Sequence, residues 1–293
     1  MTIGIYGRQF NNSVIPYVQQ VFDCLVEYNI EVLVYKNFFD FIKDKLFFPK
    51  SFGTFESHRD VKSGIDLMIS LGGDGTMLDT VTLVRDSKVP MVGINFGRLG
   101  FLASINKEDI KTAIKALVEK SYNIEVRRLL KLESETKLFG DINFALNDFT
   151  IHKRDNSAMM LTHCYIDGEF LNSYWADGLI VATPTGSTAY SLSCGGPIML
   201  PRSGNLVITP ISPHNLTVRP VILPDAHELT FEIEGRSSKY LATLDSRTEV
   251  IDSSIRLKVK RADFDVNLVR LNNESYLSTL RNKLLWGIDT RNY

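Results

Sequence analysis

One segment constrains the fold of this chain more than any other. An almost continuously apolar run at residues 65–71 leads directly into a loop of three glycines and one acid: Gly72, Gly73, Asp74 and Gly75. Continuous apolar character is typical of a parallel strand buried on both faces, and residues 77–85 follow with helical spacing. Glycines let backbone N–H groups approach an anion, and a helix start adds positive partial charge. The strand, glycine turn and helix therefore predict a phosphate-binding loop.

Asp74 is the unusual member of this loop. A carboxylate beside phosphate costs electrostatic energy unless it abstracts a proton or works with a metal, so Asp74 is the candidate catalytic group. Two other nucleotide-binding loops, GxxxxGK[ST] and GxGxxG, are absent from the sequence. The alternative interpretation is a tight turn in which Asp74 only caps the helix, but three glycines exceed what a cap requires.

The first part of the chain alternates strands with helices, which predicts an open α/β domain. Strands are expected at residues 3–6, 31–35, 65–71 and 89–95. Helices are expected at 15–28, 38–48 and 107–119, with a loop at 49–59. We therefore assign residues 1–122 to an α/β domain that binds the donor phosphates.

The pattern then changes to short strands separated by turns, which predicts a mostly antiparallel β domain. Period-2 alternation at 255–260 is typical of a half-buried antiparallel strand. A helix at 277–286 is expected to close the chain and to pack back on the first domain. We therefore expect an α/β + β fold, with residues 123–271 as a β-rich dinucleotide-binding domain and residues 272–293 returning to the first domain.

The composition excludes several classes of function. The chain has 293 residues and a net charge of −1, so no global charge attracts it to nucleic acid or to an anionic membrane. It has no apolar run long enough for a transmembrane helix. Three cysteines at irregular spacing predict reduced thiols and a cytoplasmic location. None of the five histidines has metal-ligand spacing, so no metal site formed by side chains is expected.

Two further segments could carry chemistry. Residues 177–193 lead from an apolar strand into a turn rich in hydroxyls, which suits hydrogen bonds to a sugar, a base or a phosphate. Asn147 and Asp148 head another strand, where an amide and a carboxylate can bind a base edge and ribose hydroxyls. The competing interpretations are a helix cap for the first segment and turn formation for the second.

Taken together, these segments resemble the NAD kinase family. The resemblance covers nearly the full length in the same order, and the long middle motif is its most specific part. The glycine loop alone is shared with diacylglycerol and sphingosine kinases and, more loosely, with phosphofructokinases. The matching motifs are Gly72–Thr76, Asn147–Asp148, Asp177–Gly178 with Thr183–Ser191, Gly195–Pro197, Ser212–His214 and Arg219–Pro220.

The resemblance implies phosphorylation of the 2′-hydroxyl of the adenosine ribose of NAD, which gives NADP. The donor it implies is ATP, or polyphosphate in some bacterial members, with Mg²⁺ or another divalent cation, and the expected assembly is a homodimer or homotetramer. Asp74 is then the base, and Gly72, Gly73, Gly75 and Thr76 bind the donor. The resemblance implies that Asn147 and Asp148 contact the adenosine part of the acceptor and that Asp177 lies toward its nicotinamide end. The other residues that it implies for the acceptor site are Thr185, Thr188, Ala189, Tyr190, Ser191 and Ser193.

Three positions depart from the family pattern. Asp148 stands where the family usually has Glu, so the charge is kept but retracted by about one methylene. Trp175 replaces a residue that is often Arg in bacterial relatives, which leaves the choice between NAD and NADH open. Arg247 stands where Gln or Asn is common and is expected either to contact a phosphate or to face solvent.

Two alternatives remain at this point. A lipid kinase of the diacylglycerol kinase type explains the glycine loop but not residues 183–193. A non-catalytic dinucleotide sensor explains a binding groove but not Asp74, because a pure binder gains nothing from a carboxylate against phosphate.

Overall fold

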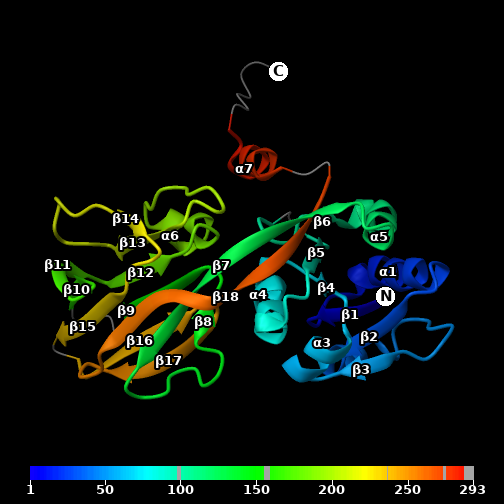
Figure 1. Cartoon of the computed structure of the whole chain (residues 1–293), viewed down its shortest axis with the longest axis horizontal. Coiled ribbons are helices and arrows are strands. Elements are labelled where there is room, and N and C mark those ends of the chain that lie inside the picture. Colours follow the sequence, from blue (N-terminus) through cyan, green and yellow to red (C-terminus); the bar gives the residue numbers. More distant parts are fainter. Residues whose placement is uncertain (98–99, 155–158, 236, 273–274, 287–293) are drawn as a thin grey trace. The chain divides into compact units, whose positions relative to one another are not determined.

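The computed structural model describes residues 1–97, 100–154, 159–235, 237–272 and 275–286. The chain divides into two compact units, Met1–Val126 with Val266–Tyr293 and Arg127–Asp265, which we call the α/β unit and the β unit. The β unit is inserted into the α/β unit along the chain. Strands β7 (Tyr122–Ser134) and β18 (Leu257–Leu271) carry the chain across the two junctions (Figure 1).

A parallel sheet forms the centre of the α/β unit. Its strand order is β3-β2-β1-β4-β5, and the C-terminal part of β18 pairs with β5. All five residues of β4 are buried, as its apolar sequence predicts. The strand bounds are β1 Thr2–Gly7, β2 Glu31–Tyr35, β3 Gly53–Phe55, β4 Leu67–Leu71, β5 Met91–Asn95 and, paired with β5, β6 Ile105–Asn106.

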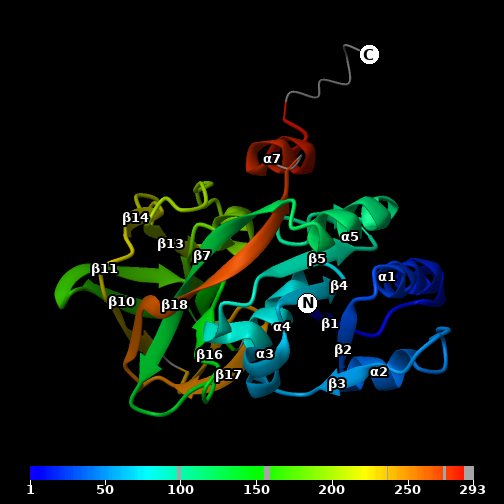
Figure 2. The same cartoon turned by 45° about the vertical axis from the view of Figure 1, so that its right-hand side comes forward.

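Helices cover both faces of this sheet (Figures 1 and 2). On one face α1 and α5 pack together and bury Phe22 and Ile114 against alternate strand residues. On the other face Thr80 of α4 donates to Ser70 of β4 at 3.0 Å, and α3 packs on α4. Strands β1 and β4 are neighbours, yet the helices that follow them lie on opposite faces, so their carboxyl ends form a topological switch point. The helix bounds are α1 Ile15–Glu27, α2 Lys36–Ile42, α3 His58–Gly64, α4 Asp74–Val84 and α5 Ile110–Val118.

The segment 42–64 differs from its predicted structure. The helix expected to reach residue 48 ends at Ile42, and the expected loop contains the edge strand β3, which pairs in parallel with β2. A strand of three residues is too short to show a period. Helix α3 was also missed, although Ser57 and Asp60 form a capping box at its start.

The C-terminal helix α7 (Tyr276–Leu284) belongs to the α/β unit, as expected. Ser275 and Ser278 form its capping box, and Leu280 is buried. The Tyr276 ring lies 6.5 Å from the Phe101 ring, and the Lys283 ammonium lies 5.8 Å from the same ring.

The β unit consists of antiparallel strands in two sets. One sheet has the order β14-β13-β12-β9-β16-β17, and the other set has the order β11-β10-β15-β18, with β7 beside β18 and β8 beside β7. A single core joins the sets: Phe149 of β9 packs on Phe231 of β15 with ring centroids 6.2 Å apart. The bounds are β8 Phe144–Ala145, β9 Asp148–Lys153, β10 Met160–Ile166, β11 Glu169–Ala176, β12 Gly178–Ala182, β13 Asn205–Ile211, β14 Val221–Pro224, β15 Leu229–Gly235, β16 Lys239–Leu244 and β17 Arg247–Asp252.

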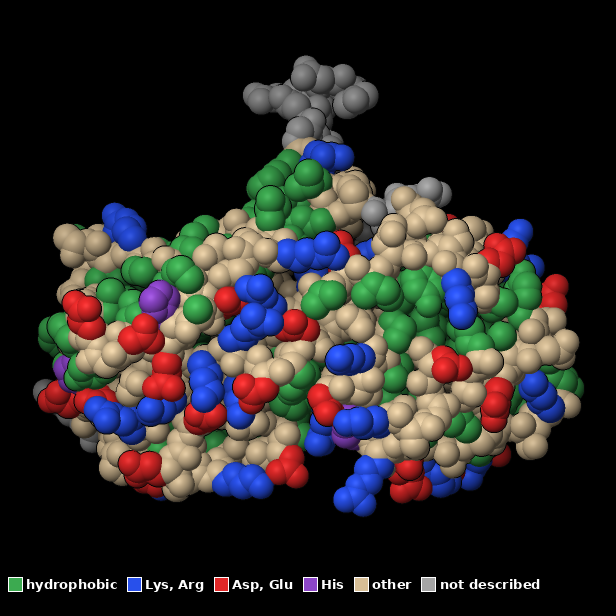
Figure 3. Space-filling view, in the orientation of Figure 1, with side chains coloured by type: hydrophobic (Ala, Val, Ile, Leu, Met, Phe, Trp, Pro, Cys, Tyr) green, Lys and Arg blue, Asp and Glu red, His purple; other side chains and the backbone are tan. Residues whose placement is uncertain are grey.

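The surface fits the near-zero net charge. On the face drawn in Figure 3, Lys and Arg side chains alternate with Asp and Glu side chains, and neither sign dominates. None of the described helices is both long and apolar enough to cross a membrane.

Candidate functional site

The glycine loop joins β4 to α4 within the α/β unit. Gly72 has φ +149°, and a Cβ on it would lie 2.3 Å from Thr76 Oγ1, so only glycine fits there. The N-cap position is Gly73, and Asp74 is the first residue of α4. The helix therefore begins three residues earlier than the apolar spacing predicts. Since Gly73 occupies the cap, Asp74 is not the helix cap that the alternative interpretation requires.

The Asp74 carboxylate instead accepts three backbone hydrogen bonds from the segment after β5. Oδ2 accepts from the Phe101 N–H at 2.8 Å, and Oδ1 accepts from Leu102 at 3.0 Å and Ala103 at 2.9 Å. A Cβ on Gly100 would lie 1.8 Å from Oδ1. Gly100 therefore leaves the space that the carboxylate occupies, and the three N–H groups fix its orientation.

A cavity of about 410 Å³ lies at the carboxyl ends of β1, β4 and β5. This is the switch point at which open α/β sheets bind ligands. The wall combines the β1–α1 connection, the glycine loop and the end of β5. Its lining residues are Arg8, Gln9, Phe10, Asn11, Val14, Leu71, Gly72, Gly73, Thr76, Asn95, Phe96 and Gly97.

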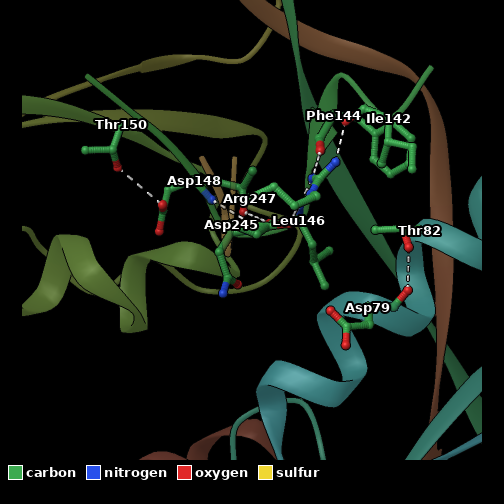
Figure 4. A network of polar contacts seen from close by, with 11 residues as sticks. Asp79, Thr82, Ile142, Phe144, Leu146, Asp148, Thr150, Asp245 and Arg247 are labelled. Atoms are coloured by element: carbon green, nitrogen blue, oxygen red, sulfur yellow. Dashed lines mark hydrogen bonds and ion pairs between the residues drawn. The ribbon is translucent and has the colours of Figure 1, made fainter. Parts of the chain in front are cut away.

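Arg8 is a cavity residue that the sequence reasoning missed. Its Nε donates to Asp79 Oδ2, and the Tyr6 hydroxyl donates to the same oxygen at 3.0 Å. Asp79 belongs to α4, where its carbonyl accepts from the Thr82 hydroxyl at 2.7 Å (Figure 4). No local motif marks Arg8, because its partner lies 71 residues away along the chain.

In the β unit, Asp148 is the first residue of β9, Asn147 directly precedes it, and the turn before β17 holds both. Figure 4 shows Asp148 beside Asp245 of that turn. The buried Asp245 carboxylate accepts from the backbone N–H groups of Leu146 at 3.0 Å, Asn147 at 2.8 Å and Asp148 at 3.3 Å. The Asn147 carbonyl accepts from the Thr183 N–H at 2.9 Å. Asp245 thus orders the segment that carries two predicted site residues, and no sequence signal pointed to it.

Asp148 is buried and close to a second acid. Burial and the Asp245 carboxylate raise its pKa to about 7, although the Thr150 hydroxyl, 3.5 Å from Oδ1, works in the opposite direction. Burial also raises the pKa of Asp245, against the backbone N–H groups and Arg247 that lower it. The pair therefore titrates closer to neutrality than ordinary carboxylates do.

Arg247 is held by the protein itself. Its Nη1 donates to the Ile142 carbonyl and its Nη2 to the Phe144 carbonyl, and Nη2 lies 3.9 Å from Asp245 Oδ2 (Figure 4). The side chain therefore connects the start of β17 to the start of β8 and the residue Ile142 just before it. In this structure its guanidinium contacts carbonyls, where the sequence led us to expect a phosphate or solvent.

The hydroxyl-rich segment divides into internal and accessible side chains. Thr183 and Ser187 are buried and donate to the Leu146 and Pro184 carbonyls at 2.6 and 2.7 Å. The Ser191 hydroxyl pairs with Thr209 at 2.8 Å. The internal hydroxyls thus hold the turn itself.

The other predicted residues of the segment lie in the short helix α6 (Tyr190–Ser193) or just before it in the chain. Thr185 is buried, Thr188 and Ala189 are half-buried, and Tyr190 and Ser193 are exposed. Burial, Cys194 and, more weakly, the carboxylates of Asp148 and Asp177 raise the pKa of Tyr190.

Asp177 and Trp175 lie at the junction of β11 and β12. The Lys153 ammonium pairs with Asp177 Oδ1 at 2.6 Å, a partner that the sequence reasoning did not identify. Trp175 lies on β11, a strand that was not predicted, and its side chain is half exposed. Within the described residues, no three His, Cys, Asp or Glu side chains are arranged to hold a metal ion.

Comparison with known proteins gives concordant matches in both units. A family model for the ATP-NAD kinase N-terminal domain matches residues 3–122, and one for the C-terminal domain matches residues 146–271. An NAD kinase from Cytophaga hutchinsonii is 51% identical over 293 residues, with 100% of both chains covered. An NAD kinase from Bacteroides fragilis is 38% identical over 292 residues, covering 99% of this chain and 100% of that one.

Two solved structures share the fold. Yeast NADH kinase complexed with NADH gives a TM-score of 0.87 at 23% identity, covering 99% of this chain and 88% of that chain. An NAD kinase from Archaeoglobus fulgidus in complex with ATP gives 0.72 at 24% identity, covering 97% of this chain and 99% of that chain. At these identities the likeness establishes the α/β + β architecture.

Proposed function

Because the chain belongs to the NAD kinase family, we propose that it transfers a phosphoryl group from ATP to the 2′-hydroxyl of the adenosine ribose of NAD, producing NADP. The chain is an enzyme, a kinase of NAD. Polyphosphate is a second donor to be tested. We further propose a cytoplasmic enzyme that works as a homodimer or homotetramer.

The observation that carries the chemistry is the fixed Asp74 carboxylate. An ionised carboxylate has about four lone-pair sites. The Leu102 and Ala103 N–H groups use both sites of Oδ1, and the Phe101 N–H uses one site of Oδ2. One site on Oδ2 remains for a hydrogen bond from the ribose hydroxyl. Asp74 can then accept that proton as attack on the donor phosphorus proceeds.

The donor phosphates are assigned to the glycine loop. Gly73 and Gly75 offer backbone N–H groups at the start of α4, where the helix adds positive partial charge. The Gly72 N–H donates to the Ile94 carbonyl at 2.9 Å and the Thr76 N–H to the Gly73 carbonyl at 3.0 Å, so these two residues shape the loop. The structure offers no three-ligand cluster among its described residues, so a divalent cation such as Mg²⁺ is expected to arrive on the donor phosphates. When bound, the cation offsets negative charge, while the loop aligns the phosphate, as in phosphoryl transfer generally.

The acceptor is assigned to the β unit. Asn147 and Asp148 are expected at its adenosine part, and Tyr190 offers an accessible ring for stacking on a base. Thr185, Thr188, Ala189 and Ser193 are expected to contact the acceptor as well, whereas the buried Ser191 hydroxyl pairs with Thr209 and is expected to support the turn. Trp175 and Asp177 are expected toward nicotinamide. Arg247 is proposed to act through the turn that it holds.

The test of Asp74 is the substitution Asp74→Asn, with NADP formation followed directly. Loss of a general base lowers kcat by on the order of 10²-fold or more, while the KM values for ATP and NAD should change little. Asp44→Asn, at an exposed acid outside the cavity, is the matched control. An Asp74→Asn enzyme that kept most of its turnover would show that another group removes the proton.

One set of assays separates the remaining alternatives. NADP or NADPH yield is measured from NAD and from NADH, with ATP and with polyphosphate, and with and without Mg²⁺. A lipid diol replaces NAD in a parallel assay, because a diacylglycerol kinase would phosphorylate it. Nucleotide binding without product in every assay would favour a sensor.

A further inference from the structure

Among the described residues that line the 410 Å³ cavity, Arg8 is the only charged one. It directly follows β1, so it stands at the carboxyl end of a central strand beside the glycine loop. Its side chain is 52% exposed and so is accessible to a ligand. No family motif in the sequence includes it.

The geometry points Arg8 at the phosphate loop. Its contact with Asp79 uses Nε, so the ion pair fixes the inner part of the guanidinium. Nη1 lies 3.8 Å from the position that a Cβ would occupy on Gly75. The outer edge of the guanidinium is therefore directed over the backbone that we assign to the donor phosphates.

The charges around the loop favour a cationic side chain there. ATP brings several negative charges, and α4 already contributes the carboxylates of Asp74 and Asp79. Backbone N–H groups and a helix start supply only partial charges. A guanidinium offers a planar, forked donor that matches phosphate oxygens in pairs, which a lysine ammonium does not.

We propose that Arg8 binds the donor polyphosphate, and that Asp79, itself fixed by the Tyr6 hydroxyl, positions the guanidinium for this contact. The proposal rests on the proposed function and adds a specific residue to its donor side. The ligand class is a nucleoside triphosphate or an inorganic polyphosphate, since both present the same chain of phosphoryl groups.

The test measures binding apart from turnover. Dissociation constants of full-length Arg8→Ala are measured by calorimetry for ATP, for inorganic tripolyphosphate and for NAD, each alone. Loss of one charge-assisted contact should raise the dissociation constants for ATP and for tripolyphosphate about 10-fold. The dissociation constant for NAD should not change. Arg8→Lys should lie between wild type and Arg8→Ala, and thermal unfolding checks that each variant is folded.

Arg59→Ala is the matched control, because it removes the same charge from an exposed helix residue outside the cavity. Unchanged binding of both phosphate ligands by Arg8→Ala would overturn the proposal, and so would an equal loss of NAD affinity. A loss for ATP but not for tripolyphosphate would place Arg8 at the nucleoside and overturn it as well. If wild type makes NADP while Arg8→Ala binds ATP normally, only the role of Arg8 fails. If wild type makes no NADP, the proposed function fails.

Discussion

Gly100 gives the sharpest test of how the base is held. Its ideal Cβ would lie 1.8 Å from Asp74 Oδ1, 2.4 Å from Cγ and 2.8 Å from Oδ2, whereas ordinary contact begins at 3.4 Å. In Gly100→Ala the carboxylate must therefore move by about 1.6 Å, or the loop must move by a similar distance. Either shift breaks hydrogen bonds from Phe101, Leu102 and Ala103. A misplacement of about 1 Å can cost on the order of 10²-fold in rate, so we expect a loss of that size in kcat.

The assay is initial-rate NADP formation with saturating ATP and NAD, together with a thermal unfolding curve. Gly64→Ala is the control, because no described atom outside its chain neighbours and the backbone of its own helix lies within 4 Å of the Cβ position there. Since the effect passes through Asp74, the double variant Gly100→Ala/Asp74→Asn should be about as slow as Asp74→Asn alone. The reasoning is refuted if folded Gly100→Ala keeps kcat within about threefold of wild type. It is also refuted if Gly100→Ala slows Asp74→Asn by a further large factor.

Two more predictions concern the β unit. Asp148 has a folded pKa of about 7, above that of an unfolded carboxyl, so the folded state binds more protons and stability falls as pH rises from about 4 to about 7. Asp148→Asn should remove this contribution to the pH dependence of stability. In urea titrations, the free energy of unfolding of Asp148→Asn relative to that of wild type should therefore be greater at pH 8 than at pH 5. The same difference between the two proteins at both pH values would contradict the raised pKa. Arg247→Ala leaves two carbonyls and Asp245 without their cation and should cost about 3 kcal/mol in the free energy of unfolding without any nucleotide. If Arg247→Ala had normal stability but bound nucleotides more weakly than wild type, Arg247 would instead be a residue that contacts the ligand.

The parts of the fold that depend on local pattern were predictable. The buried strand β4, the glycine loop and the following helix have a continuous apolar run, a glycine cluster and a helical period, and all three form in that order, although α4 begins three residues earlier than its apolar spacing predicts. Elements with weak patterns were missed. Strand β3 has three residues, and β11 lies at a sheet edge with few buried positions, so neither shows a strong period.

The partners of the site residues could not be predicted. Asp74 is held by backbone N–H groups 27 to 29 residues away, and a backbone amide is the same whatever the side chain. Asp245 reaches Asn147 across 98 residues, and Arg8 reaches Asp79 across 71. Such pairings depend on the folded topology. The hydroxyl-rich segment shows the same limit, because its sequence does not distinguish the hydroxyls that form internal hydrogen bonds, such as Ser187 and Ser191, from those that stay accessible.

The insertion of residues 127–265 into the α/β unit has a consequence for biosynthesis. The C-terminal part of β18 completes the sheet beside β5, yet a ribosome makes it after the whole inserted unit. Domains tend to fold as units while the chain emerges. The β unit can therefore mature first on the nascent chain, while the earlier segment waits, with the Met91 end of one side of β5 unpaired, until β18 has been made.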